Sequence, residues 1–379
     1  MAVSVPSNVS RAHPIEGYTS CTLDPWSKEP SVRIAQVAPL WEAVPPVGYG
    51  GTERVVSYLT EELVRRGHDV TLFATGDSWT TAKLVPIVAQ GLRLTDASPD
   101  AATAEHVRML GRVFGSADRF DVIHCHVDYW AFPFSHLVRT PTVHTIHGRL
   151  DLPYLQTVYR ELGRVPLVSI SHAQRAPLAA ARPSWVATVH HGIPLRAVEF
   201  STTHGRYLAF LGRISPEKGP DVAIDLAVRT GVPLKIAAKV DPVDREYFER
   251  AIAPRLDHPL ITFLGEVNGD EKFALLRNAR ALLFPIDWPE PFGLVMLEAM
   301  ACGTPVVARR MGSTPEIIAH GRTGFLADTS SALVEAVRRI EDIDRAECRQ
   351  HVEHHFSVER MVDDYETVYR RLLTRAAAA

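Results

Sequence analysis

Short apolar runs alternate with amphipathic segments along most of this chain. Residues 32–37 form a nearly continuous apolar run, which is followed by a glycine-rich turn and an amphipathic stretch over 52–66. Gly67 follows the basic residues that end this stretch, as is typical of a helix C-terminus. Apolar runs that alternate with helices predict a parallel sheet whose strands are buried on both faces. Further strands of the first half are predicted at 70–74, 122–125, 142–146, 165–170 and 185–190.

The same alternation begins again in the second half of the chain. Polar and small residues over 196–205 predict a linker between the halves. A final amphipathic helix is predicted over 357–375, and we expect it to return to the first half. The second half is predicted to hold strands at 207–211, 234–238, 260–264, 281–285, 305–308 and 324–327, and helices at 219–229, 242–255, 269–278 and 292–301.

These patterns divide the chain into four segments. Residues 1–30 are rich in Ser, Pro and Thr and lack the apolar stretch of a signal peptide, which predicts a flexible N-terminal arm. Residues 31–195 and 196–356 are predicted to be two doubly wound, Rossmann-like α/β domains, and 357–379 the C-terminal helix. Two such domains place a cleft between the carboxyl ends of their strands. A chain of 379 residues suits two domains, because one domain usually takes about 150.

Composition and charge exclude several classes of partner. The 41 Lys and Arg residues are balanced by 44 Asp and Glu residues, so nothing predicts a nucleic acid or an anionic membrane as partner. No apolar run reaches the roughly 18 residues of a membrane-spanning helix. The four cysteines are far apart and form no CxxC pair. Reduced thiols in the cytoplasm are therefore expected.

A glycine-rich turn separates the first predicted strand from the first helix. It contains Gly48, Gly50 and Gly51, followed by Thr52. Glycine lets the backbone approach a ligand closely, and the free N–H groups at a helix start favour an anion. A tight turn without a ligand explains the pattern equally well. The spacing is not GxGxxG, so a nicotinamide cofactor is not indicated.

Two cations follow the first strand of the second half. Arg213 ends that strand, and Lys218 comes five residues later, before a helix. At the carboxyl end of a strand they could clamp a diphosphate and neutralise the charge of a departing one. The alternative is a solvated turn in which Glu217 pairs with a neighbour.

Two glutamates flank a predicted helix start. Glu290 lies in the loop WPEPFGL, and Gly293 falls in the first turn of the following helix. Glu298 lies in an otherwise apolar helix, where an unpartnered carboxylate is costly. It either forms a salt bridge to an arginine or accepts two hydroxyl groups, such as those of a ribose. The neighbouring loop favours the second interpretation.

Several histidines invite a metal hypothesis. His124 and His126 share one face of a predicted strand and could both ligate a metal. No carboxylate or cysteine cluster repeats nearby at a ligand spacing, so structural or substrate-contacting roles are favoured for them and for His144 and His147. The remaining histidines considered are expected on the surface or in linkers: His190, His191, His351, His354 and His355.

The order of these motifs along the chain is more specific than any one of them. GYGGTERVV, HTIHG, GRISPEKG, EPFGLVMLEAMACGTPVVA and GSTPEII…GRTGFL together resemble the retaining glycosyltransferases of family 4, which have the GT-B fold. The resemblance covers roughly residues 32–376 and is most diagnostic in the second half. Glu290 and Glu298 match the paired glutamates of the family, which seven residues separate.

The resemblance implies a donor site for a nucleotide-diphosphate sugar, held mostly by the second domain. Arg213 and Lys218 would bind the diphosphate, together with backbone N–H groups of Gly293 and Leu294. Glu298 would bind the ribose hydroxyls.

The same resemblance implies roles nearer the reacting carbon. Glu290 would contact hydroxyls of the transferred sugar, and His147 would reach that sugar from the first domain. Gly50 and Gly51 would belong to the loop that closes over the diphosphate and borders the acceptor. No metal is required, because the two cations supply the positive charge. Lys239 stands where many family members have a glycine-containing turn. It could contact the diphosphate or base, or be solvated.

The implied activity is retaining transfer of a hexose, described for the family as front-face displacement in which the leaving phosphate takes the proton of the acceptor. A covalent intermediate on Glu290 is the less favoured route. UDP is the expected nucleotide of the donor, because it is frequent in the family. The acceptor is expected to be a glycan, a small molecule or a lipid, bound by loops at 75–105 and 126–140. These loops contain Trp79, Tyr129 and Trp130, which could stack on a sugar or, equally well, pack under the loops. The alternatives are a nucleotide-sugar epimerase or a non-catalytic nucleotide-sugar-binding protein on the same fold.

Overall fold

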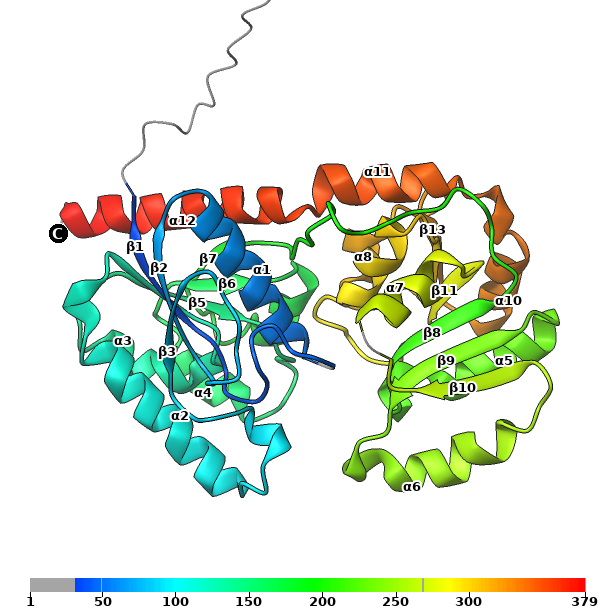
Figure 1. Cartoon of the computed structure of the whole chain (residues 1–379), viewed down its shortest axis with the longest axis horizontal. Coiled ribbons are helices and arrows are strands. Elements are labelled where there is room, and N and C mark those ends of the chain that lie inside the picture. Colours follow the sequence, from blue (N-terminus) through cyan, green and yellow to red (C-terminus); the bar gives the residue numbers. More distant parts are fainter. Residues whose placement is uncertain (1–30, 49, 268, 379) are drawn as a thin grey trace, which may run out of the picture. The chain divides into compact units, whose positions relative to one another are not determined.

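A computed structural model describes residues 31–48, 50–267 and 269–378. The segment 1–30, predicted as an arm, lies outside the described residues. Two parallel sheets organise residues 32–378, and helices cover both faces of each (Figure 1). The chain therefore has the α/β class and the doubly wound architecture that the apolar pattern predicts. No helix of the described residues is long and apolar enough to span a membrane.

The first sheet has seven parallel strands in the order β3-β2-β1-β4-β5-β6-β7. Interior strand β1 pairs Ile34 with Val70 on one side and with Val122 on the other. The strands are β1 Arg33–Val37, β2 Asp69–Ala74, β3 Lys83–Pro86, β4 Val122–Cys125, β5 Thr142–Ile146, β6 Leu167–Ser169 and β7 Trp185–Thr188. The α-helices are α1 Gly51–Arg65, α2 Pro99–Phe114, α3 Phe132–Ser135 and α4 Leu155–Leu162.

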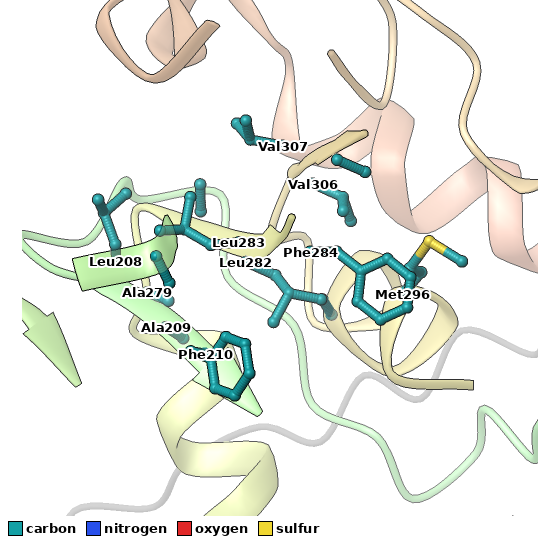
Figure 2. Packing of buried hydrophobic residues seen from close by; sticks show 14 of the residues in the cluster. Leu208, Ala209, Phe210, Ala279, Leu282, Leu283, Phe284, Met296, Val306 and Val307 are labelled. Atoms are coloured by element: carbon teal, nitrogen blue, oxygen red, sulfur yellow. The ribbon is translucent and has the colours of Figure 1, made fainter. Parts of the chain in front are cut away.

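The second sheet has six parallel strands in the order β10-β9-β8-β11-β12-β13. These strands are β8 Leu208–Arg213, β9 Leu234–Lys239, β10 Ile261–Gly265, β11 Ala281–Phe284, β12 Val306–Arg309 and β13 Gly324–Ala327. The α-helices in the remainder of the described chain are α5 Pro220–Thr230, α6 Arg245–Tyr247, α7 Gly269–Arg277, α8 Leu294–Ala301, α9 Thr314–Ile317, α10 Ser330–Arg338, α11 Arg345–His355 and α12 Val358–Ala377. Figure 2 shows buried side chains of β8, β11, β12 and α8 filling its core, among them Phe210, Leu282 and Met296.

Helix α12 packs on the first sheet beside α1. Its Val362, Tyr365 and Tyr369 join Leu59 and Leu63 of α1 in one buried apolar cluster. The chain enters α12 through a bridge between Ile193 and Ser357, where the Ile193 N–H donates to the Phe356 carbonyl at 3.0 Å. The last helix of the chain therefore completes the core of the sheet that its first strand begins.

One strand was missed and one predicted helix was wrong. Strand β3 was not predicted, because its four residues are half-buried or exposed and give no apolar run. The segment 242–255, predicted as one helix, is broken into 3₁₀ turns at Pro242–Asp244 and Ala253–Arg255, α6, and a π-turn at Phe248–Ile252. Pro254 lacks the N–H that an α-helix needs at that position, which explains the break.

Candidate active site

The carboxyl ends of both sheets border one cleft with a volume of about 760 Å³. All nine residues that the sequence assigns to donor binding or catalysis line it: Gly50, Gly51, His147, Arg213, Lys218, Glu290, Gly293, Leu294 and Glu298. They come from the ends of β5 and β8, from the starts of α1 and α8, and from the loops between. Residues 240 positions apart in the sequence thus lie around one space.

Arg213 and Lys218 lie on one wall of the cleft, and both are held by carboxylates. The Arg213 guanidinium donates to Glu217 at 2.6 Å and lies 3.8 and 3.6 Å from Asp241 and Asp244. Lys218 donates to the Glu290 carboxylate. The predicted pairing of Glu217 with a neighbour is therefore observed, yet both cations still face the cleft. Their charge is oriented before any ligand binds.

Lys218 also lies over aromatic rings. Its Nζ is 5.1 Å from the Trp288 ring centroid and 5.9 Å from that of Phe284. Arg149, from the first half, approaches the same Trp288 ring at 5.2 Å. Cation–π contacts of this kind hold a cation while leaving its other donors available.

The start of α8 is open to a ligand. Its N-cap residue is Gly293, with φ of 89°, and no side chain caps the helix. A Cβ atom there would lie 2.8 Å from Met296 and 3.0 Å from Phe284, so only glycine fits. The uncapped N–H groups of the first turn, with the helix dipole, form a site suited to a phosphate oxygen.

Glu298 has a counter-ion that the sequence analysis missed. Lys272 of α7 donates to its carboxylate at 2.5 Å, and both side chains are almost fully buried. The partner is thus a lysine and not the arginine considered as the alternative. Burial of Tyr58 and, to a smaller extent, the nearby charge of Glu298 raise the pKa of the Tyr58 hydroxyl to about 12.

The glycine-rich turn connects the two halves of the cleft. A Cβ atom on Gly51 would lie 3.9 Å from Leu294, so the start of α1 faces the start of α8. A Cβ atom on Gly48 would lie 2.5 Å from the Glu266 carboxylate, which belongs to the second half. Arg54 donates to the Gly48 carbonyl at 2.8 Å and holds the turn in place. Close backbone approach is therefore a real requirement here.

His147 lies at the end of β5 in the wall of the cleft. Its Nε2 is 2.9 Å from Nδ1 of His126, and its ring stacks on His191 at 5.2 Å. Burial lowers the pKa of His147 to about 3, so the imidazole is neutral. His191 is 4% exposed and also contacts Phe292. The expectation that His191 is a surface or linker residue was wrong, because the chain turns inward after β7.

The other histidines have protein partners. His124 shares its ring nitrogens with Tyr369 and Thr145 at 2.8 and 2.7 Å, and His126 shares its own with His147 and Gln36. His190 pairs with Glu316, and His351 with the Ile317 carbonyl. No group of three His, Cys, Asp or Glu side chains within the described ranges is arranged to hold a metal ion.

Two further carboxylates lie on the first-half side of the cleft. Asp128 follows β4 with φ of 49°, a left-handed conformation that is uncommon outside glycine and frequent at functional sites. Desolvation by the surrounding cleft raises the pKa of its carboxyl to about 6, although the residue keeps solvent exposure. Burial raises the pKa of Glu53, in the first turn of α1, to about 7. Neither residue was predicted from the sequence, although Asp128 follows a strand whose carboxyl end faces the cleft.

Among the aromatic residues suggested for the acceptor, Tyr129 and Trp130 line the cleft. Trp79 does not line it and is 69% exposed. Lys239 and Glu266 lie in the second-half wall, and Lys239 pairs with Asp241 at 3.2 Å.

Comparison with known proteins assigns both halves of the chain. Residues 49–196 match the model described as "Glycosyltransferase Family 4", and residues 195–354 match "Glycosyl transferases group 1". The chain is 28% identical to the D-inositol 3-phosphate glycosyltransferase of Mycolicibacterium smegmatis, over 74% of this chain and 75% of the relative. It is 29% identical to an uncharacterized glycosyltransferase of Methanocaldococcus jannaschii, over 78% and 84%.

Solved structures share the fold at lower identity. Sucrose-phosphate synthase from Thermosynechococcus elongatus superposes with a TM-score of 0.74 at 20% identity, covering 91% of this chain and 100% of the other. Anabaena HepE in complex with UDP and glucose gives 0.72 at 18%, covering 90% and 100%. With its two parallel sheets, its shared cleft and both family matches, this chain belongs to glycosyltransferase family 4, has the GT-B fold, and transfers a sugar from a nucleotide-sugar donor.

Proposed function

We propose that this enzyme transfers a hexose from a UDP-sugar to a hydroxyl acceptor, with retention of configuration and without a metal ion. The observation that carries the proposal is the convergence of Arg213, Lys218 and the uncapped start of α8 on one wall of the cleft. Two cations and a helix N-terminus can stabilise the negative charge of the diphosphate, which increases by one as the bond to the sugar breaks. UDP is supported by the Anabaena neighbour, whose complex contains UDP and glucose.

The two glutamates divide the donor between them in this proposal. Glu298 accepts the ribose hydroxyls, and Lys272 holds its carboxylate in the required orientation. Glu290 accepts hydroxyls of the transferred sugar. The ion pair between Glu290 and Lys218 supports this assignment, because the proposed sugar site and the proposed diphosphate site must be neighbours. A hydroxyl-binding role for Glu290 is therefore favoured over a covalent one.

The proposed reaction occurs on one face of the sugar. The bond between the anomeric carbon and the phosphate oxygen breaks, and the acceptor oxygen bonds to the same carbon from the same side. The acceptor proton passes to the departing phosphate oxygen, so no protein base is needed for that step. His147 contacts the transferred sugar, while Gly50 and Gly51 lie over the diphosphate.

The proposed division of labour follows the two sheets. Residues 31–195 would read the acceptor, a glycan, small molecule or lipid. Residues 196–356 would hold the nucleotide sugar, and 357–379 would brace the first half. Hexose donors such as UDP-glucose or UDP-N-acetylglucosamine fit this proposal, and one relative is named N-acetyl-alpha-D-glucosaminyl L-malate synthase. The proposed compartment is the cytoplasm.

The test is a thermal-shift panel with UDP, GDP, ADP and TDP. Transfer assays then use nucleotide sugars that contain the nucleotide that binds. A ligand that binds only the folded state raises the unfolding midpoint with the logarithm of its saturation. A shift confined to UDP, followed by UDP release in the presence of an acceptor, supports the proposal. A shift with another base alone overturns the UDP assignment. Binding without transfer to any acceptor favours a non-catalytic protein. Inversion of configuration at one sugar carbon, without an acceptor, favours an epimerase.

A further inference from the structure

A continuous chain of buried hydrogen bonds leads from the active site to α12. We call it the polar chain, and its members are Gln36, His124, His126, Thr145, His147 and Tyr369. All except His147 are at most 3% exposed, and the hydrogen bonds that join the six connect uncharged side chains. A buried polar network of this kind must satisfy its donors and acceptors in a consistent direction.

Gln36 sets that direction. Its amide oxygen lies 2.8 Å from Nε2 of His126, and its amide nitrogen lies 3.3 Å from the Tyr369 hydroxyl. A carbonyl oxygen only accepts, so Nε2 of His126 carries the proton. Burial lowers the pKa of His126 far below its ordinary range, so the ring is neutral and has one N–H. Nδ1 of His126 is therefore an acceptor.

The direction passes from His126 to His147. Since Nδ1 of His126 accepts, Nε2 of His147 must donate across the 2.9 Å contact. His147 is neutral as well, so its Nδ1 carries no proton. That nitrogen is enclosed and has no hydrogen-bond partner among the described residues. An enclosed acceptor without a partner is costly unless a ligand or water satisfies it.

The other arm of the polar chain holds the amide in this orientation. Tyr369 accepts from Gln36, so its own hydroxyl donates to Nδ1 of His124 at 2.8 Å. Nε2 of His124 then donates to the Thr145 hydroxyl at 2.7 Å. The Thr145 hydroxyl shares a further hydrogen bond with the Tyr365 hydroxyl at 3.0 Å, so each member of this arm has two partners. Gln36 does not line the cleft, so it can influence a substrate only through His126 and His147.

We infer that Gln36 and His126 are positioning residues that hold His147 in its Nε2–H tautomer, which leaves Nδ1 free to accept a hydrogen bond from a hydroxyl group of the bound sugar. This inference rests on the proposed function for the sugar, whereas the tautomer itself is a property of the free protein. The other tautomer would present a donor in place of this acceptor, so the proton of the sugar hydroxyl would lose its partner.

The first experiment is nitrogen NMR of the full-length protein labelled with ¹⁵N-histidine. The His147 signals are those that disappear in His147→Gln. We expect an unprotonated Nδ1 and a protonated Nε2 in the wild type. A protonated Nδ1 would overturn the inference, because the reversed amide of Gln36 would then direct the polar chain the other way. This reading needs neither substrate nor activity.

The second experiment compares variants of Gln36. Gln36→Leu removes the acceptor beside His126, so His147 should populate both tautomers and kcat/KM should fall about tenfold, the effect of one hydrogen bond. The affinity for UDP should not change, since Arg213 and Lys218 are untouched. Gln36→Glu places a carboxylate beside His126 and favours protonation of both ring nitrogens, so Nδ1 of His126 should donate and the His147 tautomer should reverse.

The matched control is Ser135→Ala. Ser135 shares a 2.8 Å hydrogen bond with Nε2 of His144, another buried histidine of β5 that is not part of the polar chain. Ser135→Ala should leave the His147 tautomer and the rate of sugar transfer unchanged. An unaltered tautomer in folded Gln36→Leu contradicts the inference, and if that variant does not fold, the wild-type spectrum still decides. Absence of transfer by the wild type would instead reject the proposed function.

Discussion

The ammonium group of Lys272 lies 2.5 Å from the carboxylate of Glu298, and both side chains are nearly inaccessible to water. This pair explains how an otherwise apolar helix can carry a charge at its centre. Removal of one partner from a buried pair leaves the other charge uncompensated, which costs far more than the pair contributes when intact.

Lys272→Met should therefore destabilise the protein by about 3 kcal/mol, measured by urea unfolding. The matched control is Arg250→Met, which breaks the ion pair with Glu246 where both side chains are about 80% exposed. The control should cost at most about 0.5 kcal/mol. Equal losses in the two variants would show that the Lys272 pair is not energetically buried.

Glu290→Ala should reduce sugar transfer by roughly a hundredfold or more while the protein still folds. The residue lies on a loop of the cleft, and Lys218, its partner, is 17% exposed and can be hydrated. Initial rates and the unfolding midpoint are the two measurements. Asp287→Asn, on the same loop at a side chain 70% exposed, is the control and should change neither. Full activity of Glu290→Ala would remove the residue from the sugar site.

The double variant Arg213→Ala, Lys218→Ala should bind UDP at least about a hundredfold more weakly, since each charge-assisted hydrogen bond contributes about 1.5–3 kcal/mol. Isothermal titration calorimetry with UDP and with uridine separates the phosphate contribution from that of the base. Lys235→Ala is the control, because Lys235 stacks on Tyr207 and does not line the cleft. Unchanged UDP affinity in the double variant would reject the diphosphate assignment.

Glu53 should make stability depend on pH. Burial raises the pKa of its carboxyl from 4.5 to about 7, so the folded state holds this proton more tightly than the unfolded chain does. The stabilisation is complete below pH 4.5 and is lost as pH rises towards 7. Glu53→Gln should consequently be more stable than the wild type at pH 8, by up to about 3 kcal/mol, and equally stable near pH 4.5.

Urea unfolding at a series of pH values measures this difference. The same substitution at Glu335, whose side chain is 59% exposed, is the control and should give a difference that does not change with pH. A constant difference for Glu53→Gln as well would mean that Glu53 is hydrated in solution.

Removal of divalent ions with EDTA should leave transfer activity essentially unchanged. Both ring nitrogens of His124 and of His126 already take part in hydrogen bonds with protein groups. The positive charge at the proposed diphosphate site comes from Arg213 and Lys218. Loss of activity in EDTA, restored by Mn²⁺ or Mg²⁺, would contradict this prediction and revive the metal hypothesis for the histidines.

Much of the fold could be predicted because burial on both faces leaves a clear sequence signal. The strands at Val122–Cys125, Thr142–Ile146 and Gly324–Ala327 have the predicted bounds, and each is apolar or small along most of its length. Strand β3 lacks that signal because it lies at the edge of its sheet. The effect of a single proline was equally hard to predict, because the apolar pattern around Pro254 is that of a continuous helix.

Site residues that belong to a local sequence motif could be predicted. Residues whose partners are distant in the sequence, and meet them only in the folded protein, could not. Gly293 and Glu290 stand in one distinctive loop. Lys272 looked like any lysine on an amphipathic helix, and only the packing of α7 on α8 brings it to Glu298, 26 residues away. His191 was missed for a similar reason, since its ring contacts His147 and Phe292 from distant segments.

The packing of α12 on the first sheet has a consequence for how the protein is made. Gln36 and Tyr369 are 333 residues apart, yet their side chains meet inside the same core. During synthesis the first sheet emerges from the ribosome long before α12. The apolar side chains on the face of the sheet that carries α1 therefore stay partly exposed until α12 has been translated. Nascent chains stopped before residue 358 should therefore depend on chaperones, although every strand of both sheets has already been translated.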